Sequence, residues 1–164
     1  MEYETTAPPL FPSFGVDIEA PGALAKAAAE ISVKNEVILV CGDGSAYASP
    51  TALNTVLQLY ALRLHHVLYL SDSLASCVSL RRALPSLACV WSSQLNASKP
   101  RHDSVCVQKY WDMRFYFYNV RKHVLSRLVG ELGYNVLQTD TDVVSGSGQV
   151  NQDALIQDLC ASCL

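Results

Sequence analysis

Residues 133–144 read GYNVLQTDTDVV, and this short stretch predicts both the kind of fold and the position of a site. Val136 and Leu137 give it the apolar character of a buried strand, which ends in the carboxylates Asp140 and Asp142. In an extended backbone, residues two apart point to the same side. Two such charges about 6 Å apart at an effective dielectric near 20 repel by roughly 3 kcal/mol. A divalent cation would remove that cost, so the stretch predicts a metal site at a strand end.

Carboxylate oxygens are hard ligands that suit Mg²⁺ or Mn²⁺, and such ions complete their shell with water and substrate phosphates. The pair therefore predicts a site for a metal and a diphosphate. The alternative is a solvated acidic turn, because Asp-Xaa-Asp is a common tripeptide. The apolar strand before the pair favours the metal site, since open α/β sheets bind ligands beyond the carboxyl ends of their strands.

Three earlier apolar runs, at residues 37–41, 67–70 and 87–91, have the length and composition of buried strands. Helical patterns stand between them at residues 53–64 and 74–84, and a long one at 107–132 precedes the last strand. Ser49 before Pro50 is the predicted N-cap of the first of these helices. The alternation predicts a Rossmann-like α/β fold, a mostly parallel sheet with helices on both faces. Right-handed crossovers would bring every strand end to one edge, together with Asp140 and Asp142.

The bulk composition fits one ordinary domain, because the chain has 164 residues, of which 50% are hydrophobic. We expect a lead-in segment with a short helix at 1–35, the α/β domain at 36–144 and an atypical tail at 145–164. The net charge of −3 argues against a nucleic-acid partner. No apolar run is long enough for a membrane span. Most of the six cysteines are expected to be buried small hydrophobic residues.

A glycine-rich loop follows the first predicted strand at residues 42–49, but it matches no phosphate-binding motif. It lacks the lysine of a Walker loop, and Tyr47 occupies the place of the third glycine in GxGxxG. Asp72, at the end of the second strand, stands where a ribose-binding acid would sit in a dinucleotide-binding fold. A dinucleotide-binding enzyme is therefore a further alternative.

Aromatic and basic residues mix in the segment 109–122, at the start of the long predicted helix. Stacking on a nucleic acid is conceivable, but aromatics at helical spacing more often form core. Arg121 and Lys122 have the charge to neutralise a diphosphate, and the alternative is a solvated helix face.

The order of these pieces resembles the nucleotide-diphospho-sugar transferase family of plant and algal type, which includes arabinosyl- and galactosyltransferases with the GT-A fold. The similarity extends over residues 37–144 and is strongest at 120–144, where a helix, Gly-Tyr, a strand and Asp-Xaa-Asp follow in the family's order. The sequence YLSDS at residues 69–73 is similar to the strand end that contacts the nucleotide in such enzymes.

The resemblance implies that Asp140 and Asp142 hold Mn²⁺ or Mg²⁺ against the diphosphate of a sugar nucleotide, with UDP-sugars as the expected donors. It also implies that Asp72 contacts the nucleoside and that the backbone around Ala46 and Tyr47 lines its pocket. A glycan or glycoprotein hydroxyl would be the acceptor, in the Golgi or endomembrane lumen.

The chain departs from the family after Val144, where the family continues into a half that binds the acceptor. We therefore expect only the nucleotide-binding half, with a sheet that is incomplete at its C-terminal side. The alternative is a non-catalytic α/β module that binds a nucleotide or a protein partner.

Overall fold

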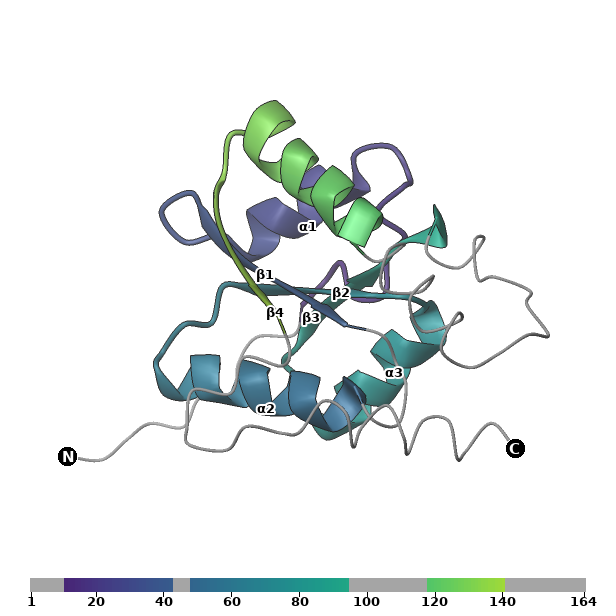
Figure 1. The fold of residues 1–164 in the computed structure, drawn as a ribbon, viewed down its shortest axis with the longest axis vertical. Helices are drawn as coiled ribbons and strands as arrows, with labels where there is room; N and C mark the ends of the chain where they lie inside the picture. Colours follow the sequence, from purple (N-terminus) through teal and green to yellow (C-terminus); the bar gives the residue numbers. More distant parts are fainter. Residues whose placement is uncertain (1–10, 43–47, 95–117, 141–164) are drawn as a thin grey trace.

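The computed structural model describes residues 11–42, 48–94 and 118–140. Within them, four strands form one all-parallel sheet in the order β3-β2-β1-β4, with helices on both faces (Figure 1). The predicted Rossmann-like α/β fold is confirmed. No helix in this part of the chain is long and apolar enough to cross a membrane.

The strands follow the apolar runs of the sequence closely. They are β1 Glu36–Gly42, β2 Val67–Ser71, β3 Ala88–Trp91 and β4 Asn135–Asp140. Every residue of β2 is buried, and so is every residue of β1 except Glu36. Burial on both faces explains why these strands read as continuous apolar runs instead of alternating ones.

The helices also lie near their predicted positions: α1 Ala23–Ile31, α2 Ala48–Ala61 and α3 Leu74–Ala83. Residues 118–126 are helical and continue into a π-helical turn, η1 Arg127–Glu131. Gly133 follows with a φ of +74°, a left-handed conformation that suits glycine after a helix. The predicted N-cap at Ser49 is wrong, because α2 begins one residue earlier, at Ala48.

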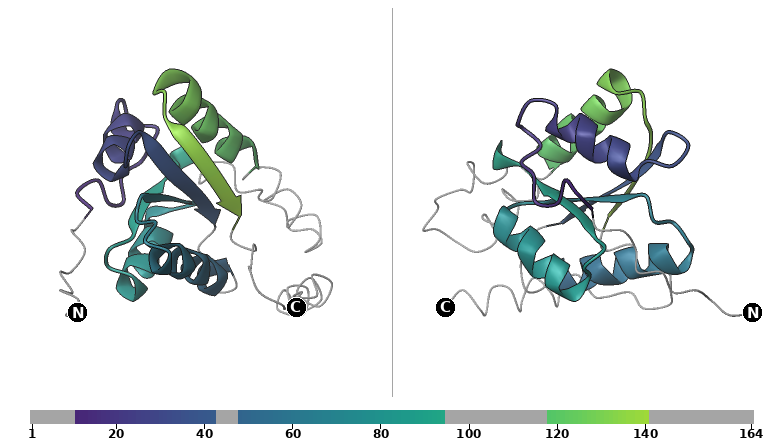
Figure 2. Two further views of the ribbon diagram at one scale, coloured as in Figure 1. Left: turned by 90° about the vertical axis from the view of Figure 1, so that its left-hand side faces the viewer. Right: turned by 180° about the vertical axis from the view of Figure 1, so that it is seen from behind.

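The two faces of the sheet are covered by different helices (Figures 1 and 2). Alternate residues of each strand supply the two cores, as the pleat requires. One face packs on α1 and on the helix at 118–131, through Val37, Leu39, Leu68, Leu70, Val90, Val124 and Leu128. The other packs on α2 and α3, through Ile38, Val40, Tyr69, Cys89, Val56 and Leu80.

The outer edge of β3 is covered by an N-terminal segment, residues 11–19. The backbone of Gly15 donates to the carbonyl of Cys89 at 2.8 Å, and that of Ile18 donates to the carbonyl of Trp91 at 2.9 Å. The backbone of Trp91 in turn donates to Val16 at 3.1 Å. This segment therefore acts as a short additional strand, whereas β4 pairs only with β1 among the described strands.

Side chains fasten the same segment to the end of β3. The carboxylate of Asp17 accepts from the backbone of Ser93 at 3.0 Å, and Glu19 accepts from the hydroxyl of Ser92 at 2.6 Å. Arg127 approaches from the helix before β4, with Nη1 3.5 Å from Oε2 of Glu19. Residues far apart in the sequence thus meet at one corner of the sheet.

Candidate functional site

The carboxyl ends of β2, β1 and β4 lie side by side at one edge of the sheet, and their register places the predicted acidic residues there. Asp140 pairs with Cys41 across β4 and β1, and Gly42 pairs with Ser71 across β1 and β2. From the strand spacing and rise, the Cα atoms of Asp72 and Asp140 stand about 10–12 Å apart. The strand β1 lies between the two.

This edge is also the point at which the strand order reverses. From β1 the chain moves outward to β2 and β3 in one direction, and it then crosses back to place β4 on the other side of β1. In open α/β sheets, ligands bind at the carboxyl ends of the strands on either side of such a reversal. Asp140, the last residue of β4, therefore lies at the position where this architecture places a ligand.

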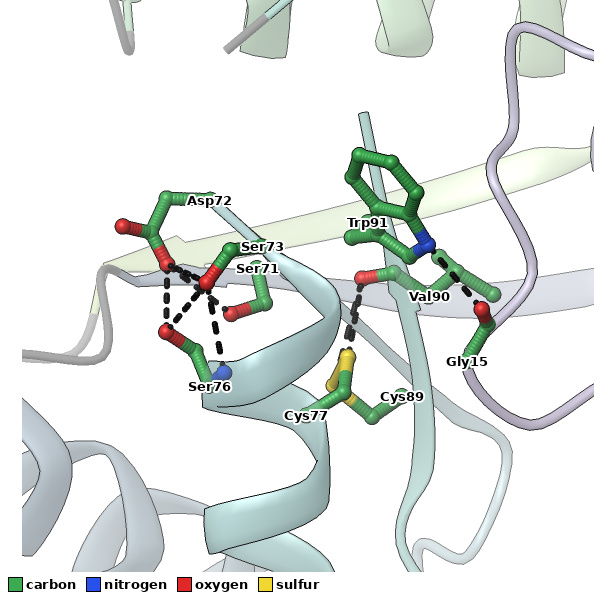
Figure 3. Close-up of a disulfide and its surroundings, with 9 residues drawn as sticks. All are labelled: Gly15, Ser71, Asp72, Ser73, Ser76, Cys77, Cys89, Val90 and Trp91. Atoms are coloured by element: carbon green, nitrogen blue, oxygen red, sulfur yellow. Dashed lines mark hydrogen bonds between the residues drawn. A yellow bond between two sulfur atoms is a disulfide. The ribbon is translucent and has the colours of Figure 1, made fainter. Parts of the chain in front are cut away.

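Asp72 is only 7% exposed and is surrounded by serine hydroxyls (Figure 3). Its Oδ1 accepts from the hydroxyls of Ser76 at 2.6 Å, Ser73 at 3.2 Å and Ser71 at 3.4 Å. Hydrogen bonds to an ionised acceptor are stronger than neutral ones, so this cluster holds the carboxylate in one orientation. Its second oxygen points away from the three serines (Figure 3).

The same serines begin α3. Ser73 has an extended backbone, and its Oγ accepts from the backbone N–H of Ser76 at 3.2 Å, which makes it the N-cap. A carboxylate at this end of a helix is favoured by the helix dipole. Asp72 thus has a structural role at the start of α3 whether or not it contacts a nucleoside.

Lys122 belongs to the helix that leads into β4. That helix joins β4 at the amino end of the sheet, and it rises by about 14 Å from Lys122 to Glu131. Lys122 therefore stands close to the level of the carboxyl edge. Its side chain is exposed and lies two residues from each of the buried Val120 and Val124, on the solvent side of the helix.

Arg121 is half-buried, and its guanidinium carbon lies 5.7 Å from the ring centroid of Tyr118. This geometry permits a cation–π contact at the exposed start of the described helix.

Three of the predicted site residues lie outside the described residues: Ala46, Tyr47 and Asp142. Asp140 is placed by the backbone pairing of β4 with β1. Within the described ranges, no three His, Cys, Asp or Glu side chains cluster closely enough to hold a metal ion. Carboxylate oxygens such as those of Asp140 and Asp142 have the hard chemistry that Mn²⁺ and Mg²⁺ prefer.

A disulfide that no sequence pattern predicted lies close to Asp72. Cys77 of α3 and Cys89 of β3 are bonded to each other, and both are fully buried (Figure 3). Cys77 directly follows Ser76, whose hydroxyl donates to Asp72. The two cysteines stand 12 residues apart on a predicted helix and a predicted strand, and that spacing was the only signal available. Cys41 is also buried and does not form a disulfide.

Compared with known protein families, with curated proteins and with solved structures, the chain matches none.

Proposed function

We propose that the carboxyl edge of this sheet binds a nucleotide-diphospho-sugar together with a divalent cation, and that the chain is the nucleotide-binding part of a glycosyltransferase with a GT-A type fold. The observation that carries the proposal is the position of Asp140. It ends β4, paired with Cys41 of β1, where the strand order reverses. Asp142 follows two residues later and would complete a pair of carboxylates for the metal.

The acidic residues at the ends of β4 and β2 would contact different parts of the nucleotide. Asp140 and Asp142 would hold Mn²⁺ or Mg²⁺ beside the diphosphate, and Asp72 would accept a hydrogen bond from the nucleoside. The estimated 10–12 Å between the Cα atoms of Asp72 and Asp140 is comparable to the length of a nucleoside diphosphate. The serine hydroxyls already orient Asp72, so little side-chain freedom would be lost on binding.

In the transfer reaction, an acceptor hydroxyl attacks the anomeric carbon of the sugar while the bond from that carbon to the diphosphate oxygen breaks, so that the nucleoside diphosphate and the hydroxyl proton are released. A bound divalent cation supplies Lewis-acid stabilisation of the negative charge on the departing nucleotide. The residues of this chain would bind and orient the nucleotide. The acceptor would be a glycan or glycoprotein hydroxyl, and the Cys77–Cys89 disulfide is in keeping with an oxidising compartment such as the endomembrane lumen.

Calorimetric titration of the purified chain with UDP, with and without Mn²⁺, tests the proposal. We expect binding that requires Mn²⁺ and that is lost in Asp140→Asn and in Asp142→Asn. Glu36→Gln is a matched control, because Glu36 is an exposed acid at the amino end of β1, on the opposite edge of the sheet. Binding that is independent of the metal, or equally weakened in all three variants, would refute the site.

Binding and turnover of further ligands distinguish between the alternative functions. Uridine and UMP lack the diphosphate and should bind much more weakly than UDP if the metal bridges to it. Tight binding of NAD without a metal would instead support a dinucleotide-binding fold with Asp72 at the ribose. Release of free sugar from a UDP-sugar distinguishes a glycosyltransferase site from a non-catalytic binding module, which would bind UDP without hydrolysis.

A further inference from the structure

The segment that carries Asp72 is held at both of its ends. Its start is fixed by the sheet, because Ser71 pairs with Gly42 on one side and with Trp91 on the other. Its end is fixed by the disulfide from Cys77 to Cys89. Cys89 of β3 pairs with Tyr69 of β2. The chain from β2 to the first turn of α3, the disulfide and this strand pairing therefore form a closed ring.

Within that ring, Cys77 is connected to Asp72 by short contacts. Its backbone N–H donates to the carbonyl of Ser73 at 3.2 Å, and the preceding Ser76 donates its hydroxyl to Asp72 at 2.6 Å. Sγ of Cys77 also lies 3.4 Å from the carbonyl oxygen of Val90. Because a disulfide has no S–H to donate, this last approach is a packing contact. Figure 3 shows the first turn of α3 between the disulfide and the serine cluster.

We propose that the Cys77–Cys89 disulfide is a positioning element for Asp72: it fixes the first turn of α3 against β3 so that Ser76 holds the carboxylate toward a bound nucleoside. This inference rests on the proposed function for its effect on nucleotide binding. Both sulfurs are fully buried, so a dithiol can reduce the bond only when α3 opens away from β3. The disulfide is therefore a fixed part of the structure around Asp72.

A double-mutant cycle tests the proposal. Ser76→Ala removes the 2.6 Å hydrogen bond to Asp72, and Cys77→Ala with Cys89→Val removes the disulfide while keeping the site apolar. Each change should weaken Mn²⁺-dependent UDP binding about five- to tenfold, less than the full effect of one hydrogen bond to a charged group, because the lost contact orients Asp72 and does not touch the nucleotide. Both changes act through the orientation of Asp72. The dissociation constant of the combined variant for UDP should therefore be almost the same as that of whichever single change binds UDP more weakly. Losses that multiply would show that the disulfide does not act through Ser76.

A matched control separates positioning from stability. Val124→Ala truncates a fully buried residue in the core on the opposite face of the sheet, so it lowers stability without touching α3. It should leave the dissociation constant for UDP unchanged at a temperature where the protein is folded. An equal loss of affinity in Val124→Ala would refute positioning, because general loosening would then explain the effect.

Hydrogen exchange tests the same inference without any nucleotide, so its result stands apart from the proposed function. In the disulfide-free variant, the amides of Ser76 and Cys77 should exchange at least about tenfold faster, while those of β1 keep their protection. If that variant does not fold, the oxidised chain still provides a test. Ser76→Ala should then make reduction of the disulfide by dithiothreitol several-fold faster, the dithiol becoming a cyclic disulfide as two thiols form. Unchanged exchange or an unchanged reduction rate would overturn the proposal.

Discussion

The indole Nε1 of Trp91 donates a 3.0 Å hydrogen bond to the carbonyl oxygen of Gly15, 76 residues earlier in the chain. This contact ties the N-terminal segment to the last residue of β3. Together with the backbone pairing of Gly15 and Ile18 with β3, it covers an edge that would otherwise expose unpaired backbone groups. Residues ahead of the first strand are therefore part of the sheet's structure.

Trp91→Phe tests how strongly this segment is held. The substitution keeps an aromatic ring but removes the donor, so the carbonyl of Gly15 loses its side-chain partner. We expect the free energy of unfolding to fall by about 1–2 kcal/mol, measured by urea denaturation. Tyr118→Phe, at a 53% exposed position, is the control and should change it by less than about 0.5 kcal/mol. Equal effects of the two would argue against the hydrogen bond.

Alanine substitutions at two glycines distinguish the stability cost of a strained backbone from that of a steric clash. Gly15 and Gly22 have φ values of +69° and +73°, so alanine at either should cost about 1–2 kcal/mol. A Cβ at Gly15 would meet Cδ1 of Leu74 at 2.8 Å, whereas one at Gly22 would meet nothing within 4 Å. Leu74 is 47% exposed and has room to rotate, so the two costs should differ by less than about 1 kcal/mol.

Chemical denaturation of both glycine variants, repeated in a Leu74→Ala background, measures that difference. In this background the extra cost at Gly15 should disappear. If it persists, the crowding at Gly15 involves the backbone of α3 and not the end of the Leu74 side chain.

The helix that precedes β4 should stabilise the whole fold through Leu128. This side chain is fully buried in the core shared with α1 and the sheet. Leu128→Ala should lower the free energy of unfolding by about 2–5 kcal/mol. The neighbouring Val129 is 50% exposed, so Val129→Ala should have little effect in the same denaturation experiment. Similar losses for both would mean that the register of this helix on the sheet is different.

Tyr60 should make stability depend on pH in alkaline solution. Burial raises the pKa of its phenol above 10.0, and a hydrogen bond with the side chain of Ser86 opposes that rise only in part. A group whose pKa is higher in the folded state contributes stability that is present below the unfolded pKa and is lost as the pH rises through the folded one. Stability should therefore fall above about pH 10.

Tyr60→Phe should remove the loss of stability that comes from ionisation of this phenol in alkaline solution. It should leave the free energy of unfolding near pH 7 almost unchanged, because the hydrogen bond from the phenol to the carbonyl oxygen of Ser86 is long, at 3.5 Å. Urea denaturation of both proteins between about pH 8 and pH 11 provides the comparison. Identical pH profiles for the two proteins would contradict the assignment, since the other titrating groups are common to both.

Much of the candidate site was predictable because it depends on strand ends. A strand that finishes in Asp140 and another that finishes just before Asp72 must meet at one edge once all crossovers have the same hand. The pairing of β1 with β2 and with β4 then set the distance between Asp72 and Asp140. Lys122 was less predictable, because charge alone does not say which side of a helix a residue occupies; the buried Val120 and Val124 put it on the solvent side.

By itself, the sequence determined the strands of the described part of the chain, the helices between them and the order in which they alternate, because apolar periodicity and a residue such as Gly133 act over a few positions. Only the tertiary structure decided that Cys77 bonds to Cys89 and that Gly15 meets Trp91. Such pairings depend on how a helix and a distant segment pack against β3, which no local pattern encodes. The stretch that ends in Asp140 thus predicts a ligand site at this strand end, and only the tertiary structure shows Asp72 among the serine hydroxyls at the start of α3.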